Sequence, residues 1–189
     1  MIKLGITGNI CSGKSQIEKI LQGLNIKTIC ADRITHDLYE DSKITLEICK
    51  ILELDKIITR SEIAKIVFKD KNKLRALEEL LHPKVYSKIN EFFYINQNEK
   101  IVAAIVPLLY ETNMEGLFEY IIALAVDEDI QLSRLMNRNS LSREDALLRI
   151  NSQKSQIEKI RKSDFVLYNN SNLQDVSKEL INILGKILR

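Results

Sequence analysis

The segment Gly8-Asn9-Ile10-Cys11-Ser12-Gly13-Lys14-Ser15 matches the pattern G-x-x-x-x-G-K-[ST] at every position. Its two glycines permit backbone angles that a Cβ forbids, so successive N–H groups can turn toward one phosphate group. Lys14 supplies a positive charge between the β- and γ-phosphates, and the Ser15 hydroxyl supplies an oxygen ligand for Mg²⁺. Because the segment follows an apolar run and precedes a helical pattern, we expect this P-loop (residues 8–15) to bind ATP with Mg²⁺.

Two aspartates follow apolar runs that are expected to be strands. A carboxylate at the carboxyl edge of a parallel sheet can accept the proton of an attacking hydroxyl group, and Asp32 has that place after Cys30-Ala31. Aspartate is also a common N-cap residue, so Asp32 equally fits the start of a helix over residues 33–39. Asp127 has a similar ambiguity, since it fits either a magnesium ligand or an acidic cap.

A group of arginines lies further along the chain, on segments with helical spacing. Arg134 and Arg138 are one helical turn apart, and Arg143, Arg149 and Gln153 follow them. Nucleotide kinases use arginines on a mobile helical flap to neutralise the phosphoryl group in transfer and to exclude water. A solvated basic face is the other interpretation of any single arginine in this set.

Five apolar segments rich in β-branched residues are predicted to be strands, at residues 2–7, 27–31, 101–107, 120–126 and 165–168. Several of them are apolar throughout, which is typical of parallel strands covered by helices on both faces. Capping boxes predict helix starts at Thr59 and Ser142, and one helical pattern is expected to end at His82-Pro83. A closing amphipathic helix is predicted within residues 172–188.

Two connections, residues 32–100 and 127–163, are longer than a simple crossover requires. We therefore predict a single α/β domain with a five-stranded parallel sheet flanked by helices. Its core comprises about residues 1–31, 101–126 and 164–189, with a helical insertion at about 32–100 and a lid at about 127–163. Ligands of such sheets bind at the carboxyl ends of the strands, where both insertions begin.

Composition restricts the classes of partner. The 189 residues carry 28 Lys+Arg and 26 Asp+Glu, a net charge of +2, which argues against a dedicated nucleic-acid partner. The longest apolar run, residues 101–109, has about half the length of a membrane helix, so no membrane partner is expected. The three cysteines form no CxxC motif, and the first residues do not resemble a signal peptide. These features predict a cytoplasmic protein, and they leave its oligomeric state open.

Several separated blocks resemble the dephospho-CoA kinase family. Residues 5–15 resemble its G-L-T-G-G-I-G-S-G-K-S, residues 82–85 its H-P-x-V, residues 106–111 its V-P-L-L-F-E and residues 164–169 its A-D-x-V-I-x-N. Asp32 falls on the second aspartate of the family's D-A-D-x-I-x-H-x-L segment, and residues 131–153 follow its flap. The P-loop is common to many families, whereas the V-P-L-L and H-P-x-V blocks are more specific.

The resemblance implies transfer of the ATP γ-phosphoryl group to the ribose 3′-hydroxyl of dephospho-CoA, the last step of coenzyme A synthesis. It implies that Asp32 is the catalytic base and that Arg138 is the flap arginine. With Lys14 of the P-loop they make up the predicted catalytic residues. It also implies that residues 32–100 bind the CoA part of the acceptor, with His82 near the pantetheine, and that Asn169 lies in the loop that holds adenine. Cys30 departs from the first aspartate of D-A-D, and Asn9 and Cys11 depart from loop glycines.

Two other functions remain alternatives. A P-loop kinase for nucleoside monophosphates would share Lys14 and the lid, and would differ in what residues 32–100 bind. A nucleotide-gated binding module would need no hydroxyl-activating base, so Asp32 and the lid arginines argue against it.

Overall fold

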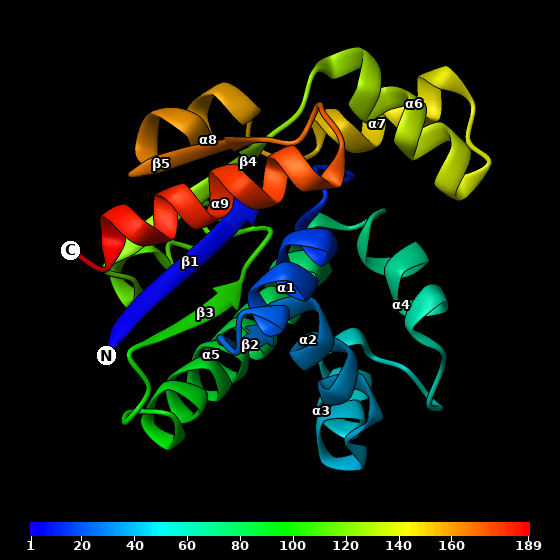
Figure 1. The fold of residues 1–189 in the computed structure, drawn as a ribbon. Coiled ribbons are helices and arrows are strands. Elements are labelled where there is room, and N and C mark those ends of the chain that lie inside the picture. The colour runs from blue at the N-terminus through cyan, green and yellow to red at the C-terminus, as the bar shows by residue number, and fades with distance from the viewer. The chain divides into compact units, whose positions relative to one another are not determined.

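The computed structural model describes residues 1–189, which divide into two compact units described separately below, residues 1–29 with 95–189 and residues 30–94 (Figure 1). The strands are β1 (Ile2–Gly8), β2 (Lys27–Cys30), β3 (Ile101–Ile105), β4 (Tyr120–Ala125) and β5 (Phe165–Tyr168). They form one sheet in the order β2-β3-β1-β4-β5, and β1 pairs in parallel with β3 and β4. The predicted five-stranded parallel α/β fold is confirmed.

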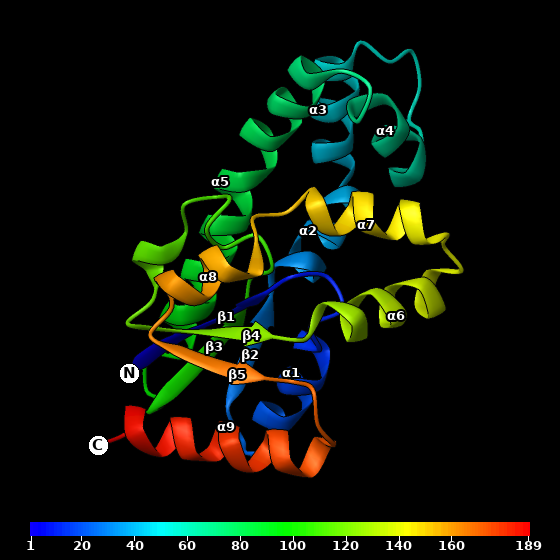
Figure 2. The same ribbon diagram turned by 90° about the horizontal axis from the view of Figure 1, so that it is seen from above.

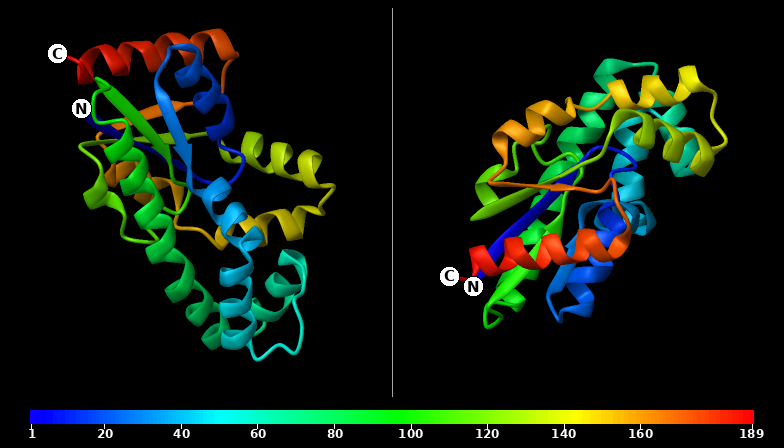
Figure 3. Two further views of the ribbon diagram at one scale, coloured as in Figure 1. Left: turned by 90° about the horizontal axis from the view of Figure 1, so that it is seen from below. Right: turned by 45° about the horizontal axis from the view of Figure 1, so that its top comes forward.

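Helices cover both faces of this sheet in the first unit. Helix α1 (Lys14–Gly23) and helix α9 (Leu173–Ile187) lie on one face, and α8 (Gln156–Lys162) lies on the other (Figure 2). A 3₁₀ turn, η1 (Glu115–Leu117), precedes β4. This covering explains why β3 is buried along its whole length and carries no polar residue. The two termini lie side by side at one end of this unit, away from the carboxyl ends of the strands (Figure 3).

The second unit is helical and has its own apolar core. It contains α2 (Ala31–Glu40), α3 (Ser42–Leu52), α4 (Arg60–Val67) and most of α5 (Lys71–Ile95). Ile48, Leu52 and Leu77 are among the side chains of its core cluster. The capping box predicted at Thr59 is confirmed, and hydrogen bonds from Thr59 lower the pKa of the Glu62 carboxyl.

The prediction that a helix ends at His82-Pro83 is wrong, because α5 continues through Pro83 as far as Ile95. A proline inside a helix removes one backbone hydrogen bond and costs about 3 kcal/mol. Leu77, Leu81, Val85 and Ile89 recur at intervals of four residues on either side of it, and all are buried. Burial of each such side chain contributes about 1.5–3 kcal/mol, so the continuous apolar face outweighs the proline.

Neither α5 nor any other helix combines the length and the apolar character needed to cross a membrane.

Candidate active site

The P-loop joins β1 to α1 through three residues with positive φ angles. Gly8 has φ 150° and Gly13 has φ 96°, both of which glycine adopts without strain. A Cβ on Gly8 would lie 2.8 Å from the carbonyl oxygen of Leu124, so this position also excludes side chains by contact. Cys11 has φ 61°, in the left-handed region that glycine adopts more readily than other residues. The family's loop has a glycine at this position, and the cysteine of this chain is strained there.

The first turn of α1 is arranged to receive an anion. Its N-cap residue is Gly13, which has no side chain to bond the first backbone N–H groups, and the first turn holds no acidic residue. The backbone N–H groups of this turn and the positive end of the helix dipole therefore point toward the same place. The Lys14 ammonium donates to the carbonyl oxygens of Gly8 at 2.8 Å and Asn9 at 2.9 Å, which holds its charge over the loop.

Ser15 is the second residue of α1, and its side chain is exposed. Mg²⁺ prefers oxygen ligands and is commonly held in kinases by one or two protein oxygens together with substrate phosphates and water. The exposed Ser15 hydroxyl, one residue after the lysine of the P-loop, fits that ligand set. Asp127 is instead the N-cap residue of α6 (Glu128–Asn139), and its carboxylate accepts a hydrogen bond from the Asn170 amide at 2.8 Å.

Asn169, predicted to belong to the nucleotide site, lies directly against the P-loop. It follows β5 and is buried, and its side-chain amide donates to the carbonyl oxygen of Ser12 at 2.9 Å. The backbone carbonyl oxygen of Asn169 accepts a hydrogen bond from the Arg134 guanidinium at 3.0 Å. The structure therefore joins Asn169, Ser12 of the P-loop and Arg134 in one group of contacts.

Replacing Gly13 by alanine is expected to weaken ATP binding by more than about tenfold, because the new Cβ would collide with the Asn169 amide at a φ angle that alanine rarely adopts. Gly23 at the other end of α1 is the matched control, since a Cβ there meets nothing within 4 Å. Equilibrium binding of ATP to the two variants measures the difference. Equal affinities for Gly13→Ala and Gly23→Ala would show that this contact does not shape the nucleotide site.

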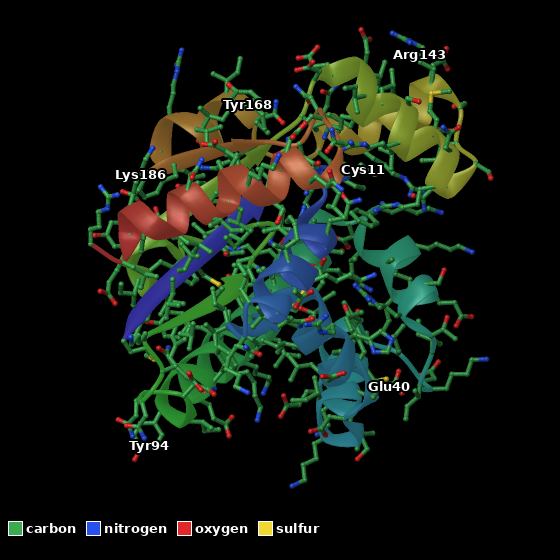
Figure 4. The ribbon with its side chains drawn as sticks, viewed as in Figure 1. Cys11, Glu40, Tyr94, Arg143, Tyr168 and Lys186 are labelled. Atoms are coloured by element: carbon green, nitrogen blue, oxygen red, sulfur yellow. The ribbon has the colours of Figure 1, made fainter.

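Two residues of the segment predicted to be a lid, Gln131 and Gln153, are hydrogen-bonded to the P-loop at Ile10. The Gln131 amide of α6 donates to the Ile10 carbonyl oxygen at 2.8 Å, and the Ile10 N–H donates to Gln153 Oε1 at 2.8 Å. Ile10 and Cys11 also pack against the apolar cluster that includes Leu135, between α6 and α7 (Arg143–Asn151). Figure 4 shows Cys11 at the tip of the loop beside these two helices.

Arg138 lies one helical turn beyond Arg134, and the two make different contacts. The Arg138 side chain is exposed in the last turn of α6, where its Nε donates to Asn139 Oδ1 at 2.9 Å. Arg134 is the arginine that contacts the loop of Asn169. Sequence spacing could not separate the two, because both fall on the same face of the helix.

The other predicted site residues, Asp32 and His82, belong to the second unit. Asp32 is exposed in the first turn of α2, where the helix dipole favours its negative charge. The N-cap residue of α2 is Cys30, so the alternative interpretation of Asp32 as a helix cap is wrong. His82 is half-buried in the middle of α5.

Sequence reasoning missed a buried lysine near the P-loop. Lys159 of α8 donates to the carbonyl oxygen of Pro107 and pairs with Glu111. In the sequence, residues 106–111 overlap the end of the predicted strand 101–107 and resemble the family block V-P-L-L-F-E, and neither feature indicates a buried ion pair. No sequence signal distinguishes Lys159 from Lys154 and Lys162 on either side of it.

Comparisons with known proteins identify the family of the chain. The model of the dephospho-CoA kinase family matches residues 2–175. A dephospho-CoA kinase of Fusobacterium nucleatum is 36 % identical over 185 residues, covering 94 % of each chain. One from Listeria monocytogenes is 34 % identical over 194 residues, covering 98 % of this chain and 97 % of the relative. A solved dephospho-CoA kinase from Campylobacter jejuni superposes with a TM-score of 0.73 at 30 % identity, covering 98 % of this chain and 96 % of that one. On these matches and on its P-loop, the chain belongs to the dephospho-CoA kinase family.

Proposed function

We propose that the chain transfers the γ-phosphoryl group of ATP to the ribose 3′-hydroxyl of dephospho-CoA, which gives CoA and ADP. Membership of the family makes it an ATP-dependent kinase that acts in coenzyme A synthesis. The observation that carries the proposal is the family match over residues 2–175, on a chain whose P-loop keeps its lysine, its hydroxyl and both glycines. Location in the cytoplasm stays a prediction.

The first unit binds the donor in this proposal. The loop N–H groups and Lys14 hold the β- and γ-phosphates, and the segment of Asn169 holds the adenine. The exposed Ser15 hydroxyl would hold Mg²⁺, which when bound offsets charge on the β- and γ-phosphate oxygens. Phosphoryl transfer depends mainly on positioning and on charge stabilisation, and fixed loop N–H groups supply both without reorganising.

Asp32 and Arg138 carry out the transfer in this proposal. The acceptor 3′-hydroxyl oxygen attacks the γ-phosphorus, its proton moves to the Asp32 carboxylate, and the bond from the γ-phosphorus to the bridging oxygen breaks. The bond electrons leave with ADP, and Arg138 neutralises charge on the transferring group. His82 lies on the pantetheine side of the bound acceptor.

Release of ADP with and without dephospho-CoA tests the function. We expect ADP to form at a rate that depends on dephospho-CoA, with CoA as the second product. AMP and dTMP serve as alternative acceptors, and faster turnover with either one would identify a nucleoside monophosphate kinase instead. Slow ADP release that is independent of any acceptor would indicate a nucleotide-gated binding module.

A further inference from the structure

Lys159 is buried in a position where the chain could have placed an apolar residue. Its side chain is 1 % exposed, whereas Ile157 two residues earlier on α8 is 60 % exposed. Removing an ammonium group from water is costly unless a partner and hydrogen bonds compensate for the lost hydration. The protein therefore maintains a charge in this place against the usual preference for apolar burial.

Two acceptors compensate for this burial, and both lie in the segment after β3. The Lys159 ammonium donates to the Pro107 carbonyl oxygen at 2.7 Å and lies 2.9 Å from Glu111 Oε1. The same Pro107 oxygen accepts a hydrogen bond from the Thr7 hydroxyl at 3.3 Å. Thr7 is buried in β1 and immediately precedes Gly8, so one end of this network reaches the first residue of the P-loop.

The other end of the network reaches the P-loop through the end of the lid. Glu111 Oε1 also accepts from the Lys154 N–H at 3.0 Å, and the Lys154 carbonyl oxygen accepts from the Asn9 side-chain amide at 3.1 Å. The preceding residue, Gln153, holds the Ile10 N–H. A continuous set of hydrogen bonds thus runs from Thr7 through the buried pair to Asn9, and encloses Gly8.

From this closed network we infer that Lys159 and Glu111 are positioning residues, which hold the start of the P-loop and the end of the lid in the arrangement that ATP requires. The inference rests on the proposed kinase function. Burial lowers the pKa of the Lys159 ammonium, and the Glu111 carboxylate opposes part of that shift. Replacement of a buried ion pair by apolar residues of similar size is often neutral for stability, so stability alone gives little reason to keep this one.

Removal of the whole pair separates positioning from stability. Lys159→Met alone leaves the half-buried Glu111 carboxylate without its cation, with only the Lys154 N–H as a donor, so the melting temperature of this variant is expected to fall. The double variant Lys159→Met/Glu111→Leu is expected to recover the melting temperature of the wild type. Its Kd for ATP is expected to stay raised, and its kcat to stay lowered, each on the order of tenfold or more. The KM for dephospho-CoA is expected to stay within about threefold of wild type, because a misplaced P-loop disturbs the donor.

Lys162→Met is the matched control, since Lys162 is on the same helix and its ammonium lies in a half-exposed pair with Glu158. If the double variant binds ATP and turns over as the wild type does, the pair does not position the P-loop and the inference is overturned. Thr7→Val gives a second test that keeps the pair intact and removes only the bond to Pro107. It is expected to weaken ATP binding in the wild-type background and to have no further effect in the double variant. Equal effects in both backgrounds would also overturn the inference.

Binding of ATP is measured separately from turnover, so that a failure of the proposed kinase function can be distinguished from a failure of the inference about Lys159 and Glu111. A wild-type chain that releases no ADP with dephospho-CoA would contradict the proposed function. The ATP affinities of the variants would still decide whether Lys159 and Glu111 set the geometry of the P-loop.

Discussion

Replacing Asp32 by asparagine is expected to lower kcat with dephospho-CoA by a factor on the order of 10² to 10⁴, while the chain folds normally and binds ATP with unchanged affinity. Asparagine has the size of aspartate and keeps one hydrogen-bond acceptor, yet it cannot take a proton from the acceptor hydroxyl. Because Asp32 is exposed in the first turn of α2, its replacement leaves no buried group without a partner. Steady-state kinetics with saturating ATP and dephospho-CoA measures the effect.

The same helix offers a matched control for this experiment. Asp37 is also exposed on α2, more than one turn beyond Asp32. Asp37→Asn changes the charge of α2 by the same amount, and its kcat is expected to stay close to that of wild type. A kcat for Asp32→Asn within tenfold of wild type, or an equal loss in both variants, would remove Asp32 from the role of base.

The strands and the P-loop could be predicted because local pattern determines them. Apolar β-branched runs between polar residues predicted all five strands, to within two residues at each end. The P-loop combines two glycines with a lysine and a hydroxyl at fixed spacing, and the structure places it between a strand and a helix as that spacing requires. Short-range chemistry was sufficient in both cases.

Features set by long-range packing could not be predicted. Pro83 locally favours the end of a helix, and only the apolar core of the second unit keeps α5 continuous through it. In α8 the isoleucine Ile157 is exposed and Lys159 is buried, which is the reverse of what side-chain polarity alone favours. Asn9 and Lys154 are 145 residues apart, so no local pattern indicates their hydrogen bond. Polar networks between distant segments of this kind are assembled by the tertiary fold.

Replacing Arg138 by alanine is expected to lower kcat by a factor on the order of 10³ while leaving the affinity for ATP within about threefold of wild type. An arginine that acts on the phosphoryl group in transfer stabilises charge present mainly in the transition state. The Arg138 side chain is exposed and bonded only to the neighbouring Asn139 in this structure, so it is free of any bond that would hold it to the protein core. Rapid-quench measurement of the chemical step, beside equilibrium ATP binding, separates these two quantities.

Arg134 is the informative comparison. It lies one turn before Arg138 on α6, and its side chain is bonded to a distant part of the chain instead of to an adjacent residue. Its guanidinium holds the carbonyl oxygen of Asn169, whose amide in turn holds the P-loop at Ser12. Arg134→Ala is therefore expected to weaken ATP binding on the order of tenfold, with a smaller loss in the chemical step. If Arg134→Ala instead lost the chemical step and Arg138→Ala retained it, the two roles would have to be exchanged. The hydrogen bond of Arg134 to Asn169 would then be a resting contact, broken when the lid acts on ATP.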